Sequence, residues 1–414
     1  MHYTGAVRFV ERYVGSLICF FFTLIHRLRR KPSDKTVRKI LVIELVEMGA
    51  AVMAYSSLRH IKQMLPNAEI HCLCLASKKD SWQMLDLIPK GNVHVLDDSN
   101  LRALFFSILS QAYHLSKKKF DIIIDYELFL RISAIIAYLI RAKFRAGYFR
   151  YTMEGMYRGD FYDIRCNFNQ NMHIAKNHLA LTKSAIALSE SHYNYAGKIE
   201  NDEIVVPVYS SDTHLKEKMS ARLQELGHKG EQLIIVAPTV GHALSVRDYP
   251  KDAYVSVVQK LIVAYPTHRI VLVGTSEHRA ICEYVNSRTG GRCINMAGGT
   301  DTLPELVEIF ALGSLLISND SGNPHFAAMV GLPTLAIFGP ETPFLYGPLG
   351  KAVCLFEFFH TSPSITAYNH KNPPIREDPS LRAISPERVV AAASTILEGK
   401  AKYGTVNNEI PYIV

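Results

Sequence analysis

The chain has 414 residues, which favours two domains, and its composition, 48% hydrophobic and 20% charged, is that of a globular protein rather than a disordered one. Its formal net charge is +8, but residues 1–39 hold nine Lys/Arg and two Asp/Glu, which accounts for +7 of it. The remainder of the chain is nearly neutral, so nucleic acid is not an expected partner.

The amino-terminal segment combines an apolar run at residues 14–25 with a basic stretch at residues 27–31. A membrane-spanning helix needs about 20 apolar residues, and this run is shorter. A secretory signal peptide carries its positive charge mainly before the apolar run, whereas here the heavier charge follows it. The pattern predicts a helix that lies in or dips into a membrane surface, with its basic flank on anionic headgroups at the cytoplasmic side. A buried helix packed on the body of the protein is the alternative.

In the first half of the chain, apolar runs rich in β-branched residues alternate with helical segments. The run at residues 39–45 is continuous, as in a parallel strand buried on both faces, and a helical stretch to about residue 64 follows it. Further strands are expected at residues 69–75, 92–96 and 120–125. This alternation predicts an open, doubly wound parallel sheet.

A second set of the same kind begins near residue 232, so the chain is expected to be an α/β protein with two doubly wound domains. Active sites of such sheets lie at the carboxyl ends of the strands. The expected strands are residues 232–237, 269–273, 315–318 and 334–338, with helices at 251–264, 277–287 and 302–311 between them. The predicted division is a membrane-associating helix and linker at 1–38, domains at 39–210 and 211–385, and a helix and tail at 386–414.

The most informative stretch is residues 315–343, where a buried strand ends at Asn319 and a short helix follows. Asp320 or Ser321 is the expected N-cap, Pro324 suits the first helical turn, and the glycine at position 331 is expected to end the helix. Unpaired backbone N–H groups and a positive dipole end at this edge suit a diphosphate. A merely well-capped strand-to-helix turn is the alternative interpretation.

This stretch resembles the signature of glycosyltransferase family 9, the heptosyltransferase group, in residue order, in spacing and in the loop that follows. The matching residues are Asn319-Asp320-Ser321-Gly322, His325, Ala327-Ala328, Phe338-Gly339-Pro340 and Thr342-Pro343. The resemblance implies a GT-B-like fold, two Rossmann-like domains facing a central cleft, and inverting, metal-independent sugar transfer from a nucleotide diphosphate donor. It also implies that Asp320, Ser321, Gly322 and His325 hold the diphosphate and sugar of the donor.

Other positions extend the resemblance on the donor side. Pro238-Thr239 and residues 247–250 are similar to two further family elements, and they make Arg247 the expected cation for the leaving diphosphate, since its planar permanent charge suits phosphate oxygens. A surface salt bridge is the alternative role for Arg247. Thr275 and Glu277 follow a strand where the family places contacts to the nucleoside, although Glu277 is also suited to cap a helix.

In the first half, residues 120–127 and 131–134 look like the second conserved block of the family. One position departs from the family pattern, because Ala50 stands where the family has the aspartate proposed as the base for the acceptor hydroxyl. Inverting transfer needs a base, and Glu47, three positions earlier, is the first candidate. Glu127, at the carboxyl end of another expected strand, is the second, and a chain without a working base is the third possibility.

No cofactor or metal is expected, because neither the seven cysteines nor His173 and His325 show the spacing of metal ligands. The expected partners are a nucleotide diphosphate sugar, a glycan or glycolipid acceptor such as lipopolysaccharide, and an anionic membrane surface. The expected location is the cytoplasmic face of a bacterial inner membrane, as a peripheral or monotopic protein. Heptose is the first candidate for the donor sugar. Two alternatives remain: a catalytically inactive sugar-nucleotide-binding protein, which Ala50 permits, and a nucleotide-sugar epimerase on the same two-domain plan.

Overall fold

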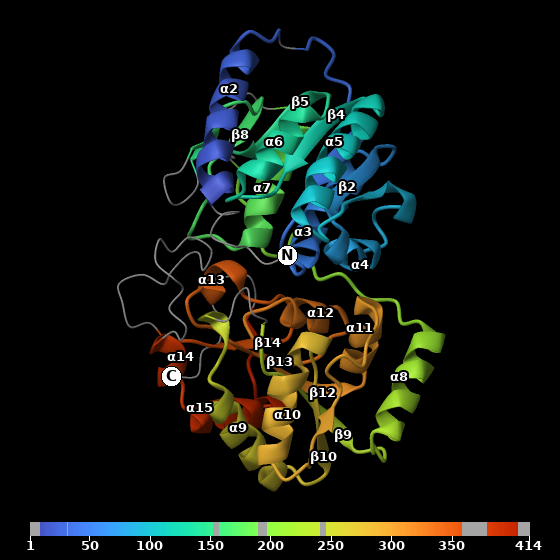
Figure 1. The fold of residues 1–414 in the computed structure, drawn as a ribbon, viewed down its shortest axis with the longest axis vertical. Helices are drawn as coiled ribbons and strands as arrows, with labels where there is room; N and C mark the ends of the chain where they lie inside the picture. Colours follow the sequence, from blue (N-terminus) through green and yellow to red (C-terminus); the bar gives the residue numbers. More distant parts are fainter. Residues whose placement is uncertain are drawn as a thin grey trace. The chain divides into compact units, whose positions relative to one another are not determined.

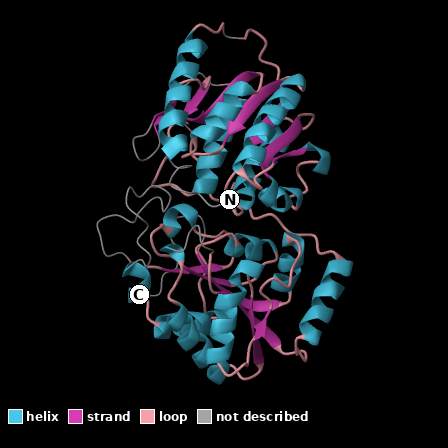
Figure 2. Cartoon of the chain, viewed as in Figure 1, coloured by secondary structure: helices cyan, strands magenta, loops and turns pink. Residues whose placement is uncertain are grey.

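The computed structural model describes residues 9–30, 32–151, 157–188, 197–240, 246–357 and 379–404. The chain divides into two compact units, Met1–Val205 and Val206–Val414. Each described unit is an α/β structure around a six-stranded parallel sheet (Figures 1 and 2). The two doubly wound parallel sheets expected from the sequence are therefore confirmed.

The sheet of the N-terminal unit has the strand order β3-β2-β1-β4-β5-β8. The chain starts in the middle at β1, builds outward through β2 and β3, and then crosses to β4, so a switch point lies between β1 and β4. The strands are β1 (Lys39–Ile43), β2 (Glu69–Leu75), β3 (Val93–Leu96), β4 (Phe120–Asp125), β5 (Ala142–Tyr148) and β8 (Ile164–Cys166). A small antiparallel pair, β6 (Arg150–Tyr151) and β7 (Tyr157–Gly159), extends beside it.

Helices cover both faces of this sheet. On one face α3 (Ala50–Met64) packs against α7 (Ile174–Ile186). On the other face lie α2 (Gly15–Arg27), α5 (Leu101–Lys117) and α6 (Arg131–Leu139), whose inner residues share one hydrophobic core with the sheet (Figure 1). Opposite faces are expected for helices that leave a switch point in opposite directions, because crossover connections are right-handed.

The amino-terminal helix α2 is packed on the unit by one face only. Cys19 is fully buried in the core, and the hydroxyl of Thr23 lies 2.7 Å from that of Tyr157. Ser16 donates a hydrogen bond to the Tyr157 carbonyl (2.8 Å), while Phe20 and Phe21 on the opposite face are exposed. No described helix is long and apolar enough to cross a membrane. Two of the basic residues of this segment, Arg8 and Lys31, lie outside the described residues, as do residues 405–414 of the predicted tail.

The C-terminal unit repeats the plan with the order β11-β10-β9-β12-β13-β14. Its central strands are buried on both faces, which explains their continuous apolar sequences. The strands are β9 (Gln232–Ala237), β10 (His268–Leu272), β11 (Ile294–Asn295), β12 (Gly313–Asn319), β13 (Thr334–Ile337) and β14 (Ala352–Leu355). The helices are α8 (Thr213–Glu225), α9 (Lys251–Ala264), α10 (Arg279–Arg288), α11 (Leu303–Ala311), α12 (Asn323–Met329), α13 (Pro343–Tyr346), α14 (Pro379–Ala383) and α15 (Pro386–Leu397).

Candidate functional site

The carboxyl edge of the C-terminal sheet collects the residues predicted to bind the donor. Because all strands of this sheet are parallel, the loops that follow them meet at one edge. Thr239 follows β9, Thr275 and Glu277 follow β10, and Asp320 follows β12. The loop after β13 adds Glu341, a residue that the sequence analysis passed over.

Arg247 joins two of these loops through buried ion pairs. Its Nη1 atom lies 3.3 Å from Oδ2 of Asp320, and its Nη2 atom lies 3.2 Å from Oε1 of Glu341. Burial raises the pKa of Asp320, and the neighbouring guanidinium acts in the opposite direction. Two carboxylates face one guanidinium, so the group is anionic when both are ionised. A phosphate that takes Arg247 must therefore compete with Asp320 and Glu341.

The turn between β12 and α12 differs from its prediction in one respect. The N-cap of α12 is Gly322 rather than Asp320 or Ser321, although the Ser321 hydroxyl still accepts a hydrogen bond from the N–H of Asn323, the first residue of the helix (3.4 Å). The reason is that the N–H of Asp320 donates to the Ile337 carbonyl (2.9 Å), which extends the pairing with β13, while its carboxylate faces Arg247. The Ser321 hydroxyl lies 3.2 Å from that of Ser318.

Pro324 and Gly331 take the positions relative to α12 that the sequence predicts. Pro324 lies in the first turn of α12, and Gly331 follows the helix end with a φ of +68°, a conformation that glycine adopts at low cost. His325 is buried within the helix. Since α12 has only seven residues, its dipole contributes less to anion binding than a long helix would.

Asn319, the first residue of the matched motif, and Asp248, within residues 247–250, hold the loops of this edge in place through hydrogen bonds. The Asn319 side-chain oxygen accepts hydrogen bonds from the N–H of Tyr249 (3.1 Å) and the hydroxyl of Tyr254 (3.0 Å). Asp248 accepts from the Thr239 hydroxyl (3.0 Å) and the N–H of Val240 (2.7 Å).

Thr275 and Glu277 lie in the turn after β10. The N–H of Thr275 donates to Nδ1 of His278 (3.2 Å), which closes a short 3₁₀ turn, η5 (Ser276–His278). Both Thr275 and Glu277 are exposed, and Glu277 lies in the first turn of η5. The two roles considered for Glu277, a ribose contact and a helix-end charge, are both compatible with this position.

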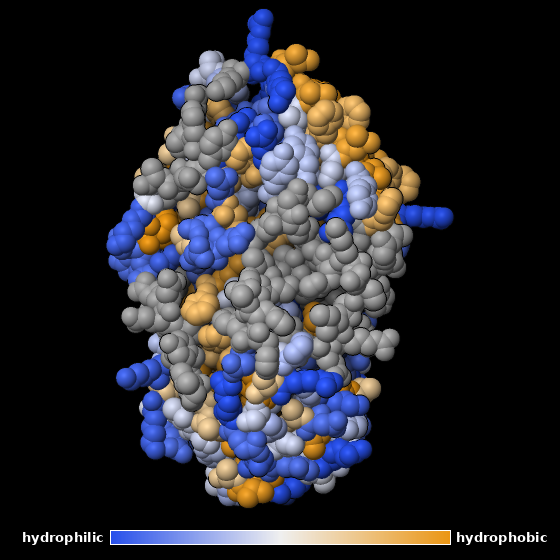
Figure 3. All heavy atoms as spheres, turned by 90° about the vertical axis from the view of Figure 1, so that its left-hand side faces the viewer, coloured by the Kyte–Doolittle hydropathy of each residue, from blue (hydrophilic) through white to orange (hydrophobic). Residues whose placement is uncertain are grey.

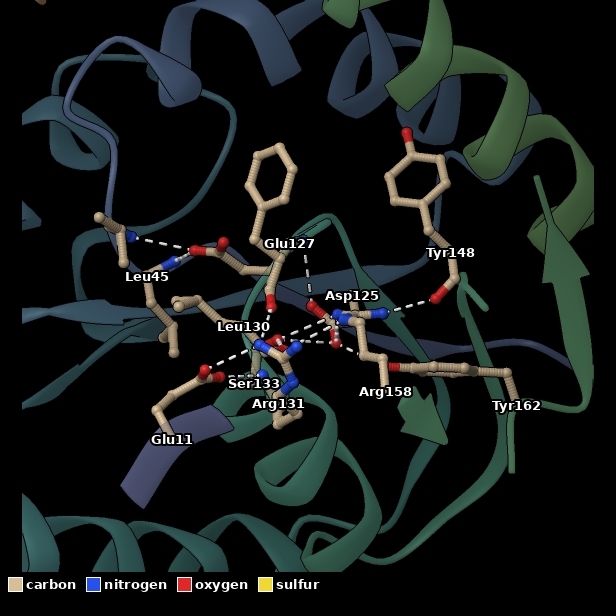
Figure 4. Close-up of polar contacts among 12 residues, drawn as sticks. Glu11, Leu45, Asp125, Glu127, Leu130, Arg131, Ser133, Tyr148, Arg158 and Tyr162 are labelled. Atoms are coloured by element: carbon tan, nitrogen blue, oxygen red, sulfur yellow. Dashed lines mark hydrogen bonds and ion pairs between the residues drawn. The ribbon is translucent and has the colours of Figure 1, made fainter. Parts of the chain in front are cut away.

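In the N-terminal unit, carboxylates gather where β1 and β4 end. Glu127 follows β4, and its Oε1 atom accepts hydrogen bonds from the N–H groups of Leu45 (2.8 Å) and Val46 (3.1 Å) in the loop after β1 (Figure 4). Burial raises the pKa of Glu127 to about 7, with Asp125 and Glu47 acting in the same direction and the two backbone donors opposing. Glu127 therefore has a pKa suited to proton transfer near neutral pH.

Glu44 and Glu47 complete this group, on the loop opposite Glu127. Burial raises the pKa of Glu44 well above its ordinary value, and Glu127 and Glu47 add to the effect. Glu47 is half-buried and close enough to influence both of its neighbours. The structure thus brings together the two predicted base candidates, Glu47 and Glu127, and adds Glu44 to them.

Asp125 supports this group rather than taking part in it. Its Oδ2 atom lies 2.6 Å from Nη2 of Arg158, and it accepts hydrogen bonds from the hydroxyls of Ser133 (3.0 Å) and Tyr162 (2.6 Å) (Figure 4). Its Oδ1 atom accepts from the N–H of Glu127 (3.1 Å). Asp125 is fully buried, and these partners compensate its charge and hold the chain that leads into Glu127.

The two histidines considered in the sequence, His173 and His325, both lie at helices of the described structure. His173 caps α7, with its Nδ1 atom accepting from the N–H of Ala175 (3.2 Å). Within the described ranges, no three His, Cys, Asp or Glu side chains are grouped as metal ligands.

Comparison with known proteins identifies the family to which the chain belongs. Residues 108–371 match the family model Glycosyltransferase family 9 (heptosyltransferase). The chain belongs to glycosyltransferase family 9. It is thus a glycosyltransferase whose matched segment includes Glu127, Arg247 and the Asp320–His325 turn.

Curated relatives and solved structures agree with this assignment. The chain is 23% identical over 303 residues to lipopolysaccharide heptosyltransferase 1 of Campylobacter coli, covering 73% of this chain and 84% of that protein. It is 25% identical over 329 residues to lipooligosaccharide heptosyltransferase 2 of Haemophilus ducreyi, covering 76% and 86%. The structure of Escherichia coli ADP-heptose LPS heptosyltransferase II superposes with a TM-score of 0.65 at 18% identity, covering 87% and 99%. A family 9 glycosyltransferase from Veillonella parvula gives 0.69 at 18% identity, covering 90% and 100%, so the fold is GT-B.

Ala50, the position expected from the resemblance to depart from the family pattern, lies outside the matched residues 108–371. Ala50 begins α3, is nearly buried, and donates its N–H to the Glu47 carbonyl (3.3 Å). In this family 9 chain the position itself carries no carboxylate. The nearest one along the chain is Glu47, in the turn that leads into the same helix.

Proposed function

We propose that the chain transfers a sugar from a nucleotide diphosphate to a hydroxyl of lipopolysaccharide or another envelope glycan, with inversion. The donor binds at the carboxyl edge of the C-terminal sheet, through Thr239, Thr275, Glu277 and Arg247, and through Asp320, Ser321, Gly322 and His325. The observation that carries the proposal is the Arg247 group, in which one guanidinium lies between Asp320 and Glu341 within the family-matched segment.

In the proposed reaction the acceptor oxygen forms a bond to the anomeric carbon as the bond from that carbon to the diphosphate breaks. Arg247 exchanges a carboxylate partner for the departing diphosphate and stabilises its developing charge. The proton of the acceptor hydroxyl passes to Glu47, the carboxylate nearest in sequence to Ala50. Glu127 is the alternative base, and its pKa of about 7 supports that role.

Heptose is the proposed donor sugar, because the curated relatives are named as heptosyltransferases. An E. coli heptosyltransferase, WaaC, is described in complex with ADP, which makes ADP the first nucleotide to test. The acceptor and the membrane contact are proposed together: the exposed face of α2 rests on the anionic cytoplasmic side of the inner membrane, where a lipid-linked acceptor lies.

Thermal unfolding of the full chain with ADP, UDP, GDP and CDP and their sugars tests the donor site. A ligand at 100 times its Kd stabilises the folded state by roughly 2.7 kcal/mol. We expect one nucleotide to raise the melting temperature, and the shift to disappear in Arg247→Gln, which removes the cation proposed to hold the diphosphate. Lys260→Ala, which removes an exposed ion pair with Glu387 elsewhere in the unit, is the control and should keep the shift. No shift with any nucleotide contradicts the proposed donor site.

Ala50 favours one second candidate, a protein that binds the sugar nucleotide without transferring it. Turnover with lipopolysaccharide acceptors separates the two. Nucleotide binding with release of nucleoside diphosphate only when acceptor is present supports the transferase. Binding with no turnover on any acceptor supports the inactive protein.

A further inference from the structure

The helix α5 carries a wider apolar surface than the fold buries. Ile108, Ala112 and Leu115 are buried in the core of the N-terminal unit. Beside this buried stripe five large hydrophobic side chains are between 48% and 67% exposed: Leu101, Phe105, Phe106, Leu109 and Tyr113. A surface helix needs a single apolar stripe to pack, so this exposed extension, rich in aromatic residues, marks a contact with something else.

The helix α2 repeats this organisation on the same side of the sheet. Cys19 and Thr23 are buried, whereas the residues that face outward are 42–56% exposed: Leu17, Phe20, Phe21, Leu24 and Ile25. Between the two helices lies α6, which contacts both and exposes Leu139. Since all three helices pack on one core with their inner faces, their outer faces look the same way (Figure 1). Figure 3 shows hydrophobic residues gathered at the upper right of that view.

Charge distinguishes this helical layer from an ordinary protein interface. None of the three helices contains an Asp or a Glu. Exposed cations stand at the ends of α2 and α5: Arg27 at the end of α2 and Arg30 after it, Arg102 in the first turn of α5, and Lys117, Lys118 and Lys119 at its end. Two copies of the chain joined through this layer would bring like charges together. An apolar surface edged by cations instead complements an anionic lipid surface.

We propose that α2, α5 and α6 form one docking surface for an anionic phospholipid bilayer. Phe20, Phe21, Phe105 and Phe106 enter the boundary between headgroups and acyl chains, and the cations at the helix ends lie among the headgroups. The proposal extends the membrane contact proposed for α2 to a second part of the chain, α5, and rests on that contact. It does not depend on donor binding.

Sedimentation of the full chain with vesicles tests the surface. We expect binding to vesicles of phosphatidylglycerol and phosphatidylethanolamine, and weaker binding to pure phosphatidylcholine or at high salt. Phe105→Ser/Phe106→Ser should lower the affinity for vesicles at least about tenfold. Two aromatic side chains that become buried in the bilayer contribute more binding free energy than a tenfold change in affinity requires. Phe20→Ser/Phe21→Ser should act similarly.

The matched control removes exposed apolar side chains from other surfaces. Met64, on the opposite face of the same unit, is 59% exposed, and Val263, in the other unit, is 78% exposed, so Met64→Ser/Val263→Ser should bind vesicles like the unaltered chain. A far-ultraviolet circular dichroism spectrum and a urea unfolding midpoint like those of the unaltered chain show that Phe105→Ser/Phe106→Ser is folded. Unchanged vesicle binding by that folded variant would overturn the role of α5. A second result would also overturn the proposal. In it, sedimentation equilibrium shows a stable dimer of the unaltered chain, Phe105→Ser/Phe106→Ser dissociates that dimer, and neither protein binds vesicles.

Discussion

Glu11 and Arg131 clamp the segment before α2 to the first residue of α6. The Nη1 atom of Arg131 lies 2.8 Å from Oε2 of Glu11, and the backbone N–H of Arg131 donates to Oε1 of the same carboxylate (2.5 Å) (Figure 4). Arg131 is buried and comes four residues after Glu127. The amino-terminal segment therefore supports the loop that carries a candidate base.

Replacing Glu11 by Ala should destabilise the N-terminal unit by about 1–3 kcal/mol, since it leaves the buried Arg131 guanidinium without its carboxylate. Urea unfolding followed by circular dichroism measures the change. Glu225→Ala, which removes an exposed pair with Arg222, is the control and should cost less than about 0.5 kcal/mol. Equal stabilities of the two variants would show that the clamp contributes nothing.

If Glu47 is the base, its removal should lower the catalytic rate, and a carboxylate at position 50 should restore part of that rate. Glu47→Gln should lower kcat by about 10²–10⁴, the range of a general base, with a smaller effect on KM. Adding Ala50→Asp to that variant should restore part of the lost rate, because the family's carboxylate then returns to the start of α3, where a helix amino terminus favours negative charge. Steady-state kinetics with the preferred donor measure both. Full activity of Glu47→Gln would move the role to Glu127.

The pH dependence of the rate separates the two carboxylates independently. A base must be ionised to act, so activity falls as the pH drops through its pKa. With Glu127 as the base, the fall is centred near pH 7, and Glu127→Gln abolishes it together with most of the rate. With Glu47 as the base, Glu127→Gln should keep much of the rate. A profile of kcat/KM from pH 5 to 9 in the unaltered chain and the variant measures the difference.

Glu127 should also make folding stability depend on pH. Its pKa is raised from 4.5 to about 7 in the folded chain, so the folded state binds more protons than the unfolded state between these values. Stability contributed by the protonated form is therefore lost as the pH rises through that window. Glu127→Gln, which cannot ionise, should lose less stability from pH 5 to pH 8 than the unaltered chain does. Parallel melting curves for the two proteins would contradict this assignment.

Glu341 should limit the affinity for the donor. Its carboxylate competes with a diphosphate for Arg247, so Glu341→Gln should bind the preferred nucleoside diphosphate more tightly, by roughly tenfold if one charge–charge contact is relieved. Calorimetric titration measures the change. Gln keeps the shape and a hydrogen-bond acceptor, so packing is preserved. Weaker binding by Glu341→Gln would instead mean that the carboxylate orients Arg247 for the ligand.

Much of the fold was predictable because strands buried on both faces have continuous apolar sequences, as β1, β9 and β12 do. The strand β5 was missed because Lys143 and Arg145 interrupt its pattern. In the structure the guanidinium of Arg145 donates to the carbonyls of Ala137 (2.8 Å) and Ile140 (2.8 Å) at the end of α6. A charged residue that satisfies another element's carbonyls cannot be recognised from local periodicity.

The residues of the candidate site also differ in whether local sequence could reveal them. The place of Asp320 at the carboxyl edge was predictable because it directly follows a buried strand, whereas Arg247 was expected there only from the resemblance of residues 247–250 to a family element. The second partner, Glu341, and the pairing of Asp125 with Arg158 depend on contacts between distant parts of the chain. Spacing does not encode such contacts, so only the three-dimensional structure reveals them.

The docking of α2 onto residues far along the chain has a consequence for biosynthesis. Thr23 and its partner Tyr157 are separated by 134 residues, so at typical rates of synthesis about 7 s or more pass before the partner exists. For most of that interval, before α6 and β7 are made, neither apolar face of the nascent helix has its folded partners. Under the proposed membrane contact, a bilayer close to the ribosome would offer both faces a place outside water before the first sheet is complete.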